Sequence, residues 1–145
     1  SLKREPAIMV IVIRSGPGFD CSWIEDGRVL AIRTTSVARE SVDAFVEFII
    51  DLLNRWPVDE AFLCLQEFTP DLTVTPYLRE QSARIIGINR TDVTGRLALV
   101  TPNLVAFTIF DLWFQSTGNM FPNVEKRAFT DRDKALSWLL GNHTE

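Results

Sequence analysis

Strand-like apolar runs alternate with segments of helical periodicity along most of the chain, and this alternation constrains the fold more than any other feature. Residues 62–68, 96–100 and 124–129 are short, apolar or alternating, and flanked by turn-forming residues, which is typical of strands. A helical segment precedes each of them. Strands separated by helices favour a mostly parallel sheet joined by right-handed crossovers. The sequence therefore predicts an α/β domain.

The N-terminal part of the chain adds an antiparallel element. Residues 19–24 and 29–34 flank a turn that contains Asp26-Gly27, a pair that tolerates the positive φ angles of a tight β-hairpin. Before the hairpin, the continuous β-branched run over residues 8–13 predicts one more strand. We expect a mixed sheet made of an N-terminal strand, a β-hairpin and then alternating helices and strands, covered by about four helices.

Local chemistry marks the boundaries of these helices. The amphipathic pattern over residues 40–56 is the clearest in the chain, and a proline ends it. The next helix is predicted to begin with Thr75 as its N-cap and Pro76 at the first helical position, where a missing N–H leaves nothing unpaired. At the start of the last helix, Thr130 and Asp133 have the spacing of a capping box.

Length and composition limit the class of protein. A chain of 145 residues fits one domain, which we place at residues 8–140 between tails at 1–7 and 141–145. No apolar run reaches the ~18 residues of a membrane-spanning helix, and the N-terminus lacks a signal-peptide pattern. Cys21 and Cys64 do not form a disulfide framework. We therefore expect a cytoplasmic protein without an integral membrane segment. The net charge of −4 argues against nucleic acid as a partner.

The sequence offers no set of residues for catalysis. His143 is the only histidine and lies in the C-terminal tail, so no nucleophilic triad can be built around a positioned imidazole. Cys64 lies between two leucines of a strand, where we expect a buried, inert thiol. Two separate cysteines and one tail histidine do not make a metal site. We predict that the protein is not an enzyme and uses no metal or cofactor.

The helix predicted over residues 104–116 is apolar on almost all sides, with few polar positions among its aliphatic and aromatic residues. Such a helix must be buried more than an ordinary surface helix. Three explanations remain open: burial in the domain's own core, a subunit interface with aromatic anchors, or the wall of a pocket for an apolar ligand. The segment lacks the basic face of a helix that lies on a membrane. The candidate binding or interface residues are Phe107, Phe110, Trp113 and Phe114.

Two segments in the second half of the chain carry a family resemblance. The first is Thr101-Pro102-Asn103-Leu104-Val105 followed by Phe110-Asp111, and the second is the strand 124–129 followed by residues 131–140. Together with the order of elements over residues 19–140, they resemble the STAS-type domain, in particular its SpoIIAA-like branch of small bacterial proteins. This branch is also likened to lipid-carrying Sec14-type domains.

The resemblance implies a regulatory or binding module. We predict a non-enzymatic module that acts through protein–protein contact and self-associates, as a homodimer or with a protein partner. The alternative is a carrier of an apolar small molecule or lipid. A more distant alternative is a phospho-regulated anti-sigma-factor antagonist, in which a serine of an Asp-Ser-Ser-Gly type motif is phosphorylated. That motif is absent here, and only Thr73 and Thr75 offer hydroxyls as possible phospho-acceptors in the region concerned.

Overall fold

The computed structural model describes residues 15–86, 88, 90–116 and 122–141. The strand predicted over residues 8–13 and the tail histidine, His143, lie outside the described residues. The described residues form a five-stranded mixed sheet with four helices, so the predicted α/β class is confirmed.

The five strands follow one another across the sheet in the order β1-β2-β3-β4-β5. The strand β1 is antiparallel to β2, as the hairpin predicts, and every later pair is parallel. The strands are β1 (Phe19–Ile24), β2 (Val29–Thr34), β3 (Phe62–Phe68), β4 (Gly95–Val100) and β5 (Val124–Phe129). The helices are α2 (Arg39–Arg55), α3 (Pro76–Ile86), α4 (Leu104–Ser116) and α5 (Arg132–Leu139).

Three successive residues with positive φ make the hairpin turn between β1 and β2. Glu25, Asp26 and Gly27 have φ angles of 53°, 58° and 82°. The N–H of Gly27 donates to the carbonyl oxygen of Ile24 at 3.1 Å, which closes the turn. Acidic residues and glycine tolerate this backbone region better than β-branched residues do.

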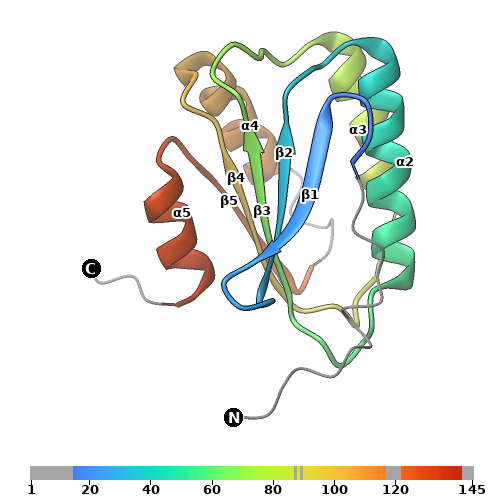
Figure 1. Ribbon diagram of the computed structural model, residues 1–145, viewed down its shortest axis with the longest axis vertical. Coiled ribbons are helices and arrows are strands. Elements are labelled where there is room, and N and C mark those ends of the chain that lie inside the picture. The colour runs from blue at the N-terminus through green and yellow to red at the C-terminus, as the bar shows by residue number, and fades with distance from the viewer. Residues whose placement is uncertain (1–14, 87, 89, 117–121, 142–145) are drawn as a thin grey trace.

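The helices lie in two layers, one on each face of the sheet. When parallel strands follow one another in chain order, right-handed crossovers put all connecting helices on one face. α2, α3 and α4 accordingly share the larger core, whereas α5, which follows the last strand, packs on the opposite face. Figure 1 shows α2 and α3 on one side of the sheet and α5 on the other. Among the helices of the described residues, none has the length and apolar character needed to cross a membrane.

The amphipathic pattern of α2 supplies most of the helical contribution to the larger core. Its buried apolar positions recur every three or four residues, and each such side chain contributes roughly 1.5–3 kcal/mol when it leaves water. The helix ends at Arg55, immediately before Trp56 and Pro57. The buried apolar residues of α2 are Val42, Phe45, Val46, Phe48, Ile49, Leu52 and Leu53.

The last helix begins one residue later than its sequence pattern predicts. Asp131 is the N-cap of α5, and its Oδ1 accepts a hydrogen bond from the N–H of Asp133 at 3.1 Å. The prediction that Thr130 caps this helix is wrong, because the extended backbone of Asp131 already brings a carboxylate to the unpaired helix N–H groups. Trp138 is buried against Phe129 on this face of the sheet, with ring centroids 5.6 Å apart.

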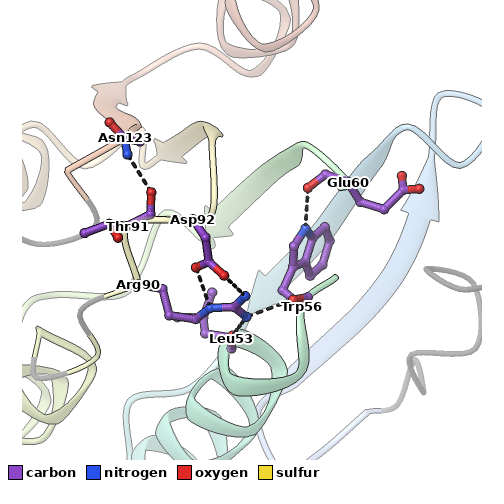
Figure 2. Close-up of polar contacts among 7 residues, drawn as sticks. All are labelled: Leu53, Trp56, Glu60, Arg90, Thr91, Asp92 and Asn123. Atoms are coloured by element: carbon purple, nitrogen blue, oxygen red, sulfur yellow. Dashed lines mark hydrogen bonds and ion pairs between the residues drawn. The ribbon is translucent and has the colours of Figure 1, made fainter. Parts of the chain in front are cut away.

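A polar cluster joins the C-terminus of α2 to the connection before β4, and Figure 2 shows its members. Arg90 donates from Nη1 to the carbonyl oxygens of Leu53 and Trp56, at 2.9 and 2.8 Å. Asp92 holds the other side of the guanidinium through two bonds, of 3.0 and 2.9 Å. The last carbonyls of a helix have no partner within it, so Arg90 acts as a cap from a distant segment. This cluster fixes the end of the sheet where the parallel strands begin.

Candidate binding site on α3 and α4

Asn103 determines where α4 begins and how it sits on the domain. Its Oδ1 accepts hydrogen bonds from the N–H groups of Val105 and Ala106, at 3.0 and 3.1 Å, which is the N-cap arrangement. Its Nδ2 donates to the carbonyl oxygen of Leu72, in the connection between β3 and α3, at 3.4 Å. The same residue therefore starts α4 and ties it to the segment that leads into α3.

The inner side of α4 is held by aromatic contacts. Phe110 is 3% exposed and lies with its ring centroid 5.2 Å from that of Phe68 on β3. Trp113 lies 6.4 Å from Phe110 and stacks on Phe114 at the same centroid distance. Phe107, Trp113 and Phe114 are half-buried and pack against the larger core. All four aromatic residues singled out from the sequence thus point toward the domain rather than away from it.

The outer face of α4, which we define as Leu104, Val105 and Leu112, is exposed and largely apolar, with the exposed Thr108 among these three residues. These side chains are 69%, 70% and 59% exposed, and the remaining exposed large apolar residue of the described part of the chain is Val58. Of the residues of α4, only Ala106 and Phe110 are fully buried. The helix covers the edge of the sheet near β5, with nothing packed on its other side among the described residues.

The polar side chains of α4 bond within the helix itself. Thr108 Oγ1 donates to the carbonyl oxygen of Leu104 at 2.9 Å, and Gln115 Nε2 donates to Asp111 Oδ2 at 3.2 Å. Asp111 is the one ionisable residue of the helix. The outer face therefore has little need of water as a hydrogen-bond partner, which makes it suitable for contact with another apolar surface.

A pocket lies between the helices and the sheet, beneath α3 and α4. Its floor is formed by β3, β4 and β5, and its walls by α2, α3 and α4, with Phe110, Trp113 and Phe114 on the α4 side. Its volume is about 90 Å³. Across the floor, Cys64 pairs with Leu97 and Leu97 pairs with Lys126, so these residues form one row.

Three polar side chains interrupt the apolar wall of this pocket. They are Gln66 on β3, Ser82 on α3 and Lys126 on β5. Lys126 Nζ donates to the carbonyl oxygen of Val124 at 2.9 Å, and burial lowers the pKa of its ammonium group. Trp113 lines both this pocket and a shallower groove beside α3, where Arg79 and Glu80 lie. Most of the pocket surface is therefore apolar, but one cation and two neutral hydrogen-bonding groups also line it.

The two candidate phospho-acceptors lie in the segment that leads into α3. Thr75 Oγ1 accepts a hydrogen bond from the N–H of Leu78 at 3.0 Å, so the predicted N-cap is confirmed. Thr73 is exposed two residues earlier. The first turn of α3 is also linked to α2, because Tyr77 Oη donates to Asp43 and the Arg39 guanidinium lies 4.0 Å from the Tyr77 ring centroid. These contacts give Thr75 and its neighbours a structural role at the start of α3.

The two thiols are buried and separate. Desolvation raises the pKa of Cys21 to about 12 and raises the pKa of Cys64 as well. β2 lies between their strands, so roughly 9–10 Å of sheet separates them, more than a disulfide can span. Among the described residues, no group of three or more histidine, cysteine, aspartate or glutamate side chains is placed to hold a metal ion.

The structure adds six residues to the candidates drawn from the sequence. Leu104, Val105 and Leu112 form the exposed patch, and a helical wheel drawn from the aromatic positions would have placed them opposite the inner side. Of the polar pocket residues, Lys126 had the plainest signal. It is a charged residue at an inward position of β5, between Val124 and Ala128. Gln66 and Ser82 join it only through the topology of the sheet.

No protein-family model matches the chain, and comparison with curated proteins and with solved structures finds no match either. The α/β architecture therefore rests on the structure alone. The resemblance to the SpoIIAA-like branch of STAS domains stays a prediction.

Proposed function

We propose that the protein is a non-enzymatic binding module that self-associates through the outer face of α4. The observation that carries this proposal is the concentration of exposed apolar surface there: three of the four exposed large apolar side chains among the described residues lie on this helix. Exposed apolar side chains that gather on one helix face are typical of a protein-contact site. Two buried reduced thiols suit the reducing cytoplasm in which we expect the protein to act.

A second copy of the same chain is the occupant that fits this face best. A two-fold symmetric dimer puts the same patch of both subunits in contact, so an uncharged apolar face is complementary to itself. Asp111 lies at the margin of the outer face, one position before Leu112 in sequence but on the side of the helix away from Val105. The absence of basic residues on α4 disfavours a membrane surface as the occupant.

The size of the face indicates which class of interface to expect. A standard interface takes about 800 Å² from each partner, which is more than three side chains supply. Half-buried neighbours such as Ile109 would have to contribute at its border. We therefore expect a transient dimer, with an interface at the low end of the size range.

Sedimentation equilibrium over a range of protein concentrations tests the proposal. The wild type should approach twice the monomer mass as concentration rises, and Val105→Asp with Leu112→Asp should stay monomeric because two carboxylates would be buried at the contact. Val58→Asp is the matched control, since Val58 is 63% exposed but lies on the connection between α2 and β3. A wild type that stays monomeric at millimolar concentration contradicts the proposal, and so does a control that dissociates the dimer equally.

A further inference from the structure

The pocket beneath α3 and α4 has a wall whose polar groups do not call for a polar ligand. In the described part of the chain, the buried side-chain polar atoms without a hydrogen-bond partner are Nε1 of Trp23 and Oγ1 of Thr34 and of Thr69. None of these three residues lines the pocket. Lys126, on the pocket floor, already donates to the carbonyl oxygen of Val124. What the pocket offers to a ligand is therefore apolar surface.

Aromatic rings form a large part of that surface. They come from α2, β3 and α4 and belong to Phe45, Phe62, Phe68, Phe110, Trp113 and Phe114. Aromatic rings prefer edge-to-face or offset contacts with one another, and such contacts stabilise beyond the area that they bury. Phe68 and Phe110 already meet in a tilted arrangement, with an angle of 51° between their planes. The wall therefore favours a ligand that is itself an aromatic ring over a flexible alkyl chain.

The volume of the pocket limits the size of the ligand. A dry apolar cavity of ~150 Å³ takes up benzene, so a space of about 90 Å³ admits at most one such ring. Two fused rings or a lipid chain exceed this volume. An unfilled apolar space forfeits packing contacts for the side chains around it, and water is stable there only with two to four polar partners. A single apolar ring would restore the missing contacts.

Trp113 separates the pocket from the surface of the molecule. Its side chain lines both the pocket and the shallower groove beside α3. Trp113, Phe114 and Ile85 of α3 are half-buried, whereas Phe110 is 3% exposed. Partly exposed side chains change rotamer on the picosecond to nanosecond timescale. A small ligand can therefore enter between α3 and α4 without unfolding either helix.

We propose that this pocket binds a small uncharged molecule with a single aromatic ring, which enters between α3 and α4 and packs among the rings of the wall. The proposal does not depend on self-association, because the outer face of α4 and the pocket lie on opposite sides of that helix. The dimer and the ligand site can therefore fail or succeed separately.

Nuclear magnetic resonance titration of the full chain with benzene tests this proposal. Methyl resonances of Ile49, Leu97 and Leu99, which line the pocket, should shift and saturate, because the ring current of a bound benzene acts on nearby nuclei. The dissociation constant should be on the order of 1 mM for a ligand of so few atoms. Absence of saturable shifts at these methyl groups would overturn the proposal.

Three related compounds test the class of ligand. Benzoate has the same ring with a charge and should bind about ten-fold more weakly or worse, because its carboxylate would leave water for an apolar space. Cyclohexane lacks the aromatic character and should bind several-fold more weakly. Naphthalene has two fused rings and should cause no saturable shifts. Equal or tighter binding of any of the three contradicts the corresponding part of the assignment: neutral charge, aromatic character or size.

Variants of the pocket floor locate the binding. Leu97→Phe fills the space from β4 and should weaken benzene binding about ten-fold or more. Leu63→Phe is the matched control, because Leu63 is a half-buried leucine of β3 on the other face of the sheet, and it should leave binding unchanged. Unchanged binding in a folded Leu97→Phe variant contradicts the assigned site, and so does an equal loss in Leu63→Phe.

A second variant at the same position keeps the test decisive if Leu97→Phe does not fold. Leu97→Ala enlarges the pocket and should allow naphthalene to bind, with saturable shifts at the methyl groups of Ile49 and Leu99. A folded Leu97→Ala variant that still excludes naphthalene would show that the ring does not bind over β4.

Discussion

Arg90 and Trp56 are joined by a hydrogen bond of 2.8 Å, from guanidinium Nη1 to the carbonyl oxygen that follows the last turn of α2. The two residues are 34 positions apart, yet this bond and its neighbour to Leu53 close the end of the helix. The Trp56 side chain is in turn fixed by its own bond, from Nε1 to the carbonyl oxygen of Glu60 at 2.9 Å, as Figure 2 shows. A connection without regular structure therefore stabilises the longest helix of the domain.

Replacement of Arg90 by methionine should measure that contribution. The carbonyl oxygens of Leu53 and Trp56 would lose their charged donor, although Leu53 would keep the N–H of Trp56. Loss of hydrogen bonds from a charged donor should lower the free energy of unfolding by about 2 kcal/mol. Urea denaturation followed by circular dichroism provides the measurement. Arg55→Met is the control, because Arg55 forms an exposed ion pair with Asp51 that should contribute less than about 1 kcal/mol. Similar losses in both variants would contradict the capping role.

The pairing of Arg90 with Asp92 should make stability depend on pH in the acid range. The hydrogen bond from Arg90 holds the pKa of the Asp92 carboxyl below its ordinary value of 3.8. A carboxyl with a depressed folded-state pKa stabilises the fold above its unfolded pKa, and this stabilisation is lost as the pH falls through the folded value. The difference in unfolding free energy between wild type and Asp92→Asn should therefore be largest near neutral pH and shrink below about pH 4. A difference that stays constant from pH 7 to pH 3 would show that the pair is not coupled to protonation.

Gly95 should be the glycine that tolerates substitution least. It begins β4 with φ of 149°, and a Cβ atom there would lie 1.9 Å from the carbonyl oxygen of Phe62 on β3. Gly95→Ala should lower the free energy of unfolding by more than about 2 kcal/mol, because both the backbone region and the neighbouring strand oppose a side chain. Gly141→Ala is a matched control with positive φ but open space around it, and should cost only about 1 kcal/mol. Equal thermal shifts in the two variants would contradict the close approach of β3 and β4.

The sequence predicted those parts of the fold that local chemistry determines. Asp26-Gly27 marked the hairpin, and Thr75 with Pro76 marked the start of α3, because turn and cap preferences act over a few residues. The start of α5 was missed by one position, since Thr130 and Asp131 both have side chains that can cap a helix. Which of two such residues caps the helix depends on the backbone conformation with which the chain leaves the sheet.

The site could be predicted only in part, because its residues come together through the tertiary structure. Along α4, apolar residues occupy both sides, so hydrophobic periodicity did not show which side faces the sheet, and only the positions of the aromatic residues distinguish the side of Phe110 from that of Leu112. The side of α4 that faces the sheet follows from two tertiary contacts. Asn103 bonds to the carbonyl oxygen of Leu72, and the ring of Phe110 packs against that of Phe68 on β3. The polar pocket residues come from three separate elements, and no spacing in the sequence links Ser82 to Lys126.

Truncation of a side chain on α4 should lower the free energy of unfolding much more on the inner side than on the outer face. Phe110 is buried against Phe68, so Phe110→Ala should leave a cavity and lower the free energy of unfolding by about 3–5 kcal/mol. Leu112→Ala removes an exposed side chain and should change the stability of the monomer by less than about 0.5 kcal/mol. Urea denaturation at micromolar protein concentration, where self-association is minimal, separates these values. A large loss for Leu112→Ala under these conditions would mean that the outer face is covered within the same chain, and the proposed dimer contact would then have no surface on which to form.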